Sequence, residues 1–88
     1  MRYELMALKG LVTWTKKYAY GGHWVGYLNA DPSFEVVLEQ TPGTTNWNLT
    51  IEKGYDAYLV AYPDNKKQAA YFIEDWIDRG MQMEYDEW

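Results

Sequence analysis

The feature of this sequence that most constrains its fold is a stripe of large apolar residues near the C-terminus. Five of these residues are spaced 3, 1, 3 and 1 along the chain, the spacing of one helical face: Ala69, Phe72, Ile73, Trp76 and Ile77. Asn65 followed by Gln68 is typical of a capping box, with Asp64 as the alternative cap, and Gly80 suits the left-handed residue that ends many helices. The pattern predicts a helix over residues 65–79, whose apolar face a second layer must cover.

Alternation of apolar and polar residues upstream of this helix predicts that the second layer is a sheet. The predicted strands cover residues 11–20, 23–29, 34–39, 47–52 and 55–62. Gly21-Gly22 separates the first strand from the second, and Thr41-Pro42-Gly43-Thr44 separates the third from the fourth. Both sequences are typical of the turns in antiparallel hairpins. The short connections favour strands that pair in chain order.

Together these elements predict a single α+β domain over residues 1–88. Its architecture is an antiparallel β-meander of four or five strands with one C-terminal amphipathic helix packed on one face. Residues 2–9 suit either a short helix or a strand, and we favour the strand. Residues 81–88 are consistent with an added edge strand or with an acidic tail.

Acidic residues are concentrated in the last part of the chain. The 88 residues carry a formal net charge of −5, and residues 1–53 contribute nothing to it, because five acids and five bases cancel there. Residues 54–88 hold eight acids against Lys66, Lys67 and Arg79. A negative field of this kind repels phosphate backbones and attracts basic surfaces. We therefore expect a larger protein with a basic surface as the partner, and no direct binding to nucleic acid.

The residue types that most catalytic sites need are scarce. His23 is the only histidine, Ser33 is the only serine and there is no cysteine, so neither an activated nucleophile nor a transition-metal site is expected. Glu35 and Glu39 on one strand, with Glu52 on the next, are candidates for an acid and base pair, but the pattern marks none of them as buried. We expect no enzyme activity, no catalytic residues, no metal and no cofactor.

The sequence also lacks the usual features of membrane insertion and secretion. No stretch approaches the ~20 apolar residues of a membrane span, and no basic cluster with an apolar run follows Met1. A small secreted scaffold normally needs cysteines as well. We expect a cytoplasmic protein that contacts no membrane and is a monomer or a homodimer.

Charge and aromatic content together favour a protein that acts by binding. The chain has five Trp and nine Tyr, more than so small a core buries, and such side chains are enriched in protein interfaces. The residues expected to bind a partner belong to the predicted helix and to the segment after it: Glu74, Asp75, Asp78, Glu84, Tyr85, Asp86, Glu87 and Trp88. The predicted function is that of a small acidic inhibitor, in the class of phage anti-defence (anti-CRISPR-like) proteins and toxin-neutralising immunity proteins. Such an inhibitor blocks a basic, nucleic-acid-binding surface of a larger target.

Two other functions are open on the sequence alone. Trp14, Trp24 and Tyr27 lie on predicted strands and would form the aromatic platform of a carbohydrate- or peptide-binding module. Alternatively, residues 81–88 or an exposed edge strand would pair two copies of the chain in an oligomer-forming structural subunit.

Overall fold

The sheet and the helix expected from the sequence are both present. The computed structural model describes residues 10–18, 22–41 and 43–84. In these residues, five antiparallel strands pair in chain order and a helix follows them: β1 (Val12–Tyr18), β2 (His23–Leu28), β3 (Glu35–Gln40), β4 (Trp47–Lys53), β5 (Asp56–Ala61) and α2 (Lys66–Asp78). The predicted α+β meander with a C-terminal helix is confirmed, whereas residues 2–9 lie outside the described part of the chain.

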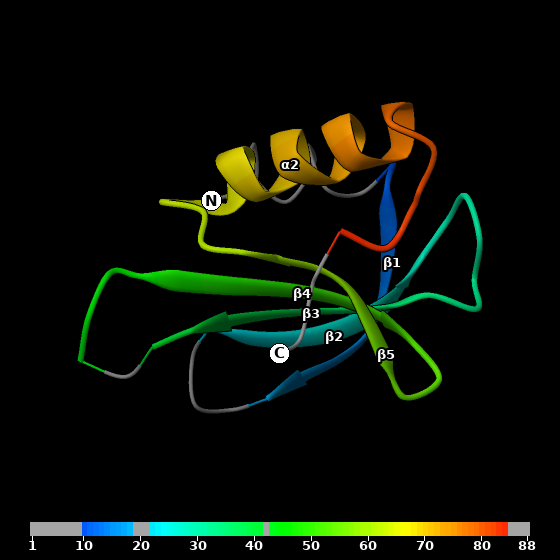
Figure 1. Ribbon diagram of the computed structural model, residues 1–88. Coiled ribbons are helices and arrows are strands. Elements are labelled where there is room, and N and C mark those ends of the chain that lie inside the picture. Colours follow the sequence, from blue (N-terminus) through cyan, green and yellow to red (C-terminus); the bar gives the residue numbers. More distant parts are fainter. Residues whose placement is uncertain (1–9, 19–21, 42, 85–88) are drawn as a thin grey trace.

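The molecule has two layers, with α2 packed across one face of the sheet (Figure 1). Two rows of paired residues cross the sheet beneath α2, the first Trp24, Leu38, Leu49 and Ala61 and the second Gly26, Val36, Ile51 and Leu59. From the helix, Ala69, Ala70, Ile73 and Trp76 are buried against them. The core therefore lies between the two layers, because the sheet covers the apolar face of the helix.

The ends of α2 form as the sequence predicts, with one difference. Asn65 Oδ1 accepts a hydrogen bond from the Gln68 N–H at 2.8 Å, as in a capping box. In a capping box the Gln68 side chain would accept a hydrogen bond from the N–H of the cap residue, Asn65. Here Gln68 Oε1 accepts instead from the N–H of Asp64, one residue earlier, at 2.6 Å. At the other end Gly80 has a φ of 97°, and the next N–H donates to Trp76 O at 3.1 Å, which are two features of a Schellman C-cap.

Trp76 lies at the centre of the core and is fully buried. Its ring meets the ring of Phe34 edge to face with 5.3 Å between centroids, and Phe34 meets Tyr58 in the same way at 4.9 Å. The indole N–H of Trp76 donates to Gln82 O at 2.8 Å. This bond satisfies a buried donor and also holds the chain that follows α2 against the core.

Candidate partner-binding surface

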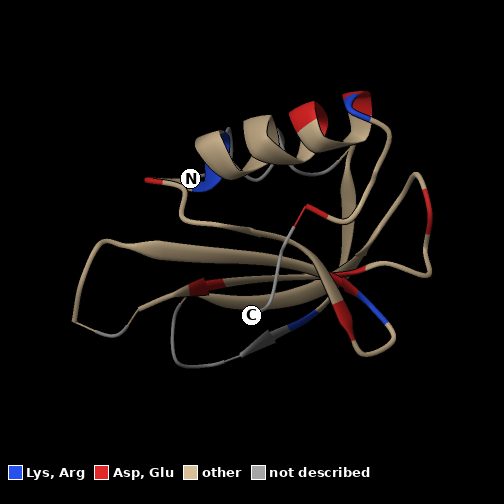
Figure 2. Cartoon of the chain, in the orientation of Figure 1, with Lys and Arg blue, Asp and Glu red and all other residues tan. Residues whose placement is uncertain are grey.

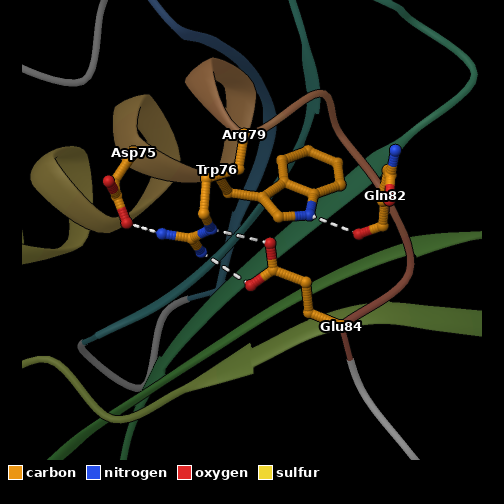
Figure 3. Close-up of polar contacts among 5 residues, drawn as sticks. All are labelled: Asp75, Trp76, Arg79, Gln82 and Glu84. Atoms are coloured by element: carbon orange, nitrogen blue, oxygen red, sulfur yellow. Dashed lines mark hydrogen bonds and ion pairs between the residues drawn. The ribbon is translucent and has the colours of Figure 1, made fainter.

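Arg79, directly after α2, binds two of the carboxylates predicted to contact a partner. Its guanidinium forms an ion pair with Asp75, one helical turn earlier. It also donates two hydrogen bonds to Glu84, from Nε to Oε2 at 2.8 Å and from Nη2 to Oε1 at 2.6 Å. Figure 3 shows the guanidinium between the two carboxylates. The contact with Glu84 is bidentate, which adds geometric specificity to the charge attraction.

These contacts shift the pKa values of both partners. The hydrogen bonds to Glu84 raise the pKa of Arg79, and the same bonds lower the pKa of Glu84. Both groups are therefore charged at neutral pH, and a positive charge stands among the acids of this region. Arg79 therefore partly neutralises the acids of this region, an effect that the net charge of residues 54–88 does not reveal.

The chain after α2 is held beside β5. The Glu84 N–H donates to Tyr58 O at 2.7 Å, and Gln82 O accepts the indole hydrogen bond of Trp76. Residues 81–84 form no strand. The first half of the predicted edge strand or tail is thus an irregular but attached extension. The remaining predicted contact residues lie outside the described part of the chain: Tyr85, Asp86, Glu87 and Trp88.

The helix acids and Glu84 together form what we call the acidic surface. Its members are Glu74, Asp75, Asp78 and Glu84, and the three on α2 are exposed, as predicted. Within the described residues, Glu74 and Asp78 form no ion pair. Tyr71, about one turn before Glu74 and two turns before Asp78 on the helix, is 68% exposed. Figure 2 shows that Asp and Glu gather along the second half of α2 and the segment after it, whereas Lys lies near the start of the helix.

The predicted platform of Trp14, Trp24 and Tyr27 does not form. Trp14 and Trp24 pack against the core, with ring centroids 5.8 Å apart. Tyr27 is three residues from Trp24 on the same strand, and an odd spacing on a strand places side chains on opposite faces. The prediction was wrong because it grouped the three aromatics without applying this alternation.

Trp24 instead contacts a cation of the protein itself. Lys66 begins α2 and is only 6% exposed, and its Nζ lies 5.0 Å from the ring centroid of Trp24 and 5.6 Å from that of Trp47. Cation–π contacts of this kind offset part of the cost of removing an ammonium group from water. The two indoles are therefore engaged inside the protein.

Glu35, Glu39 and Glu52 lie on the sheet face opposite α2. Glu35 pairs directly with Glu52 across β3 and β4, whereas Glu39 pairs with Asn48 on β4 and with His23 on β2. Burial, then a hydrogen bond and the negative charge of Glu35, raise the pKa of Glu52. The structure thus brings together two of the three carboxylates that the sequence suggested.

The remaining candidate chemical groups are not brought together. His23 begins β2, whereas Ser33 lies beyond the other end of that strand and donates its hydroxyl to Asp31 at 2.7 Å. Among residues 10–18, 22–41 and 43–84, no group of three or more His, Asp or Glu side chains is placed to hold a metal. In the same part of the chain, no helix has the length and apolar character needed to span a membrane.

Comparisons with known proteins yielded no relative of this chain. No protein-family model, no curated protein and no solved structure matches it. The functional interpretation therefore depends on the acidic surface itself.

Proposed function

We propose that this protein is a small acidic inhibitor that binds the basic, nucleic-acid-binding surface of a larger protein. The acidic surface makes the contact, together with Tyr71 beside it and residues 85–88, which follow Glu84 in the sequence. Lysine and arginine side chains of the target supply the opposite charge. The protein acts by occupying the target's surface, in the manner of anti-defence and immunity proteins, and not by catalysis.

The observation that carries this proposal is the attachment of Glu84 to Arg79. Through this contact, carboxylates from α2 and from the chain after it lie on one surface. The four carboxylates and one guanidinium leave a net charge of −3 there. A local charge of this sign attracts a basic protein and speeds its association at low salt.

The same contact gives the surface a defined geometry. Arg79 fixes the orientation of Glu84, and Trp76 fixes the neighbouring backbone, so less conformational freedom is lost when a partner binds. Glu74 and Asp78 have no ion pair within the described residues and are available to arginines of the partner. Tyr71 adds exposed aromatic area of the kind that contributes most to protein interfaces.

A pull-down from a lysate of the source cells tests the proposal. The baits are the unaltered chain and two double variants with equal changes in charge. One variant, Glu74→Lys with Asp78→Lys, alters the acidic surface but keeps the carboxylates that bind Arg79. The matched control, Glu35→Lys with Glu39→Lys, alters the opposite face of the sheet. Each bait is washed at low salt and at about 0.15 M salt, where surface charges are screened within about 8 Å.

We expect one bound protein that the unaltered chain and the control retain, that the Glu74 and Asp78 variant loses, and that is held less firmly at the higher salt concentration. Once purified, that protein should bind nucleic acid, and the unaltered chain should displace the nucleic acid from it. Equal retention on all three baits, or binding that is indifferent to salt, contradicts the proposal.

A further inference from the structure

A cavity of about 280 Å³ lies between the base of the β3–β4 hairpin loop and the connection from β5 to α2. We call it the hairpin cavity, and its lining includes Thr41, Asn46, Trp47, Asn48, Tyr62 and Asp64. The hairpin loop and the start of α2 lie at the same end of the molecule (Figure 1). The volume is close to the lower limit for small-molecule sites, which suits a ligand portion of one ring.

Polar side chains of the hairpin cavity have unused hydrogen-bonding capacity. Asn48 Nδ2 makes only a long contact of 3.5 Å, to Thr41 Oγ1. The side-chain amide of Asn46 and the carboxylate of Asp64 form no hydrogen bond with any described residue. Each amide offers donors and an acceptor, and the carboxylate accepts several hydrogen bonds. Such a set can bind neighbouring hydroxyl groups that donate and accept at the same time.

Tyr62 supplies the exposed aromatic surface of the cavity lining. Tyr62 is 72% exposed, so most of its ring is in contact with water in the free protein. Trp47 also lines the cavity, but its indole packs against the core and contacts Lys66, so it is not free to cover a ligand. Covering an exposed aromatic ring with the apolar face of a ligand removes both surfaces from water, which favours binding.

The charges around the cavity decide which class of ligand fits. A cation is not favoured, because the positive charge of Lys66 beside Trp47 offsets the attraction of the Asp64 carboxylate. An anion is disfavoured by the Asp64 carboxylate. A purely apolar ligand would cover the polar side chains without satisfying them, which is costly.

A neutral ligand with an apolar face and several hydroxyl groups meets all three conditions. We propose that the hairpin cavity binds one ring of a neutral carbohydrate. The C–H face of the sugar packs on the exposed ring of Tyr62. The sugar hydroxyls bond to Asn46, Asn48 and Asp64.

This site is separate from the acidic surface. The hairpin cavity lies at the start of α2 and the acidic surface at its end, and a helix of 13 residues separates them by about 20 Å. The carbohydrate proposal therefore does not rest on the inhibitor proposal, and either can fail alone.

An NMR titration of the 88-residue chain tests the carbohydrate proposal. The neutral probes are glucose, galactose, mannose and N-acetylglucosamine, and the charged probes are arginine and citrate. The variants Tyr62→Ala and Asp64→Asn each remove one type of contact. Tyr71→Ala and Asp78→Asn are matched controls, because they make the same changes at exposed positions of α2 outside the hairpin cavity.

We expect at least one neutral sugar to shift the signals of residues 46–48 and 62–64. Tyr62→Ala and Asp64→Asn should each weaken that binding by about tenfold or more, and the two controls should leave it unchanged. All four altered side chains are exposed, so we expect each variant to fold. A backbone NMR spectrum that is unchanged away from the altered residue checks this. The proposal is overturned if no neutral sugar shifts these signals, if arginine or citrate binds there more tightly, or if the controls weaken binding as much.

Discussion

Glu52→Gln is predicted to make the protein more stable at neutral pH. In the folded chain Glu52 lies directly opposite Glu35, and burial, followed by the hydrogen bond and charge of Glu35, raises its pKa. A raised pKa means that ionised Glu52 is less favourable in the folded chain than in the unfolded chain. A neutral amide of almost the same shape removes this cost and can still donate a hydrogen bond to Glu35.

The size of the gain follows from the geometry of the pair. Like charges directly opposite each other on neighbouring antiparallel strands cost about 0.2–1 kcal/mol. In a domain of this length, that range corresponds to a rise in Tm of about 1–8 °C. Because the folded pKa is raised, the stability associated with protonated Glu52 is complete below the usual carboxyl pKa of about 4.3 and is lost as the pH rises through the folded value. The advantage of the variant should therefore be present at about pH 7 and absent at about pH 4.

Urea unfolding at these two pH values, followed by tryptophan fluorescence, measures the difference in the free energy of unfolding. Glu39→Gln is the matched control, because Glu39 lies on the same face of the sheet, on the strand of Glu35, but opposite Asn48 and His23 and not opposite a carboxylate. If Glu52→Gln gains no more stability than Glu39→Gln at pH 7, or if its gain persists at pH 4, the like-charge explanation is refuted.

Three further predictions concern the fold and the acidic surface. Gly26→Ala should lower the free energy of unfolding by about 1–3 kcal/mol in urea unfolding, because its added Cβ would lie 2.3 Å from a backbone carbonyl oxygen of β1. Gly10→Ala is the control, since an added Cβ there has no neighbour within 4 Å. Asn65→Ala should cost about 0.5–2 kcal/mol in the same assay, because it removes the N-cap of α2. Arg79→Gln should return the pKa of Glu84 to the ordinary carboxyl range in an NMR titration, and an unchanged pKa would show that the ion pair does not form in solution. Since Arg79 lowers that pKa, the stability it contributes through Glu84 is present at neutral pH and is lost as the pH falls through the lowered value, so the variant and the unaltered chain should converge in acid.

The helix and the sheet order could be predicted from the sequence because their signals are local. The apolar stripe, the cap and the terminal glycine stand close together, and the observed helix Lys66–Asp78 differs from the predicted range 65–79 only by the residues that flank it. Neighbouring strands are joined by short turns, so pairing in chain order has the lowest entropic cost. The alternation that places Trp24 and Tyr27 on opposite faces was equally present in the sequence.

The surroundings of the acidic surface could be predicted only in part. Asp75 and Arg79 are four residues apart on a helix, a spacing that permits an ion pair, so this contact could have been inferred. The bond between Arg79 and Glu84 could not have been inferred from the sequence. It depends on the turn at Gly80 and on the hydrogen bond from the Trp76 indole to Gln82 O, which fixes the following segment. The two connections that line the hairpin cavity meet because β4 pairs with β5, which the sequence predicted, but its lining could not be read from that pairing alone.

Arg79 affects the proposed inhibitor in two opposite ways. It reduces the net negative charge of the acidic surface by one, which weakens the attraction of a basic partner at long range. It also fixes the side chains of Asp75 and Glu84, so fewer groups lose conformational freedom when the partner docks. Among related complexes the association rate varies much less than the dissociation rate, so order within the interface has more influence on affinity than a single unit of charge. Partial neutralisation by Arg79 is therefore compatible with tight binding. Arg79 removes one unit of negative charge, but it also holds Asp75 and Glu84 in a defined arrangement before the partner binds.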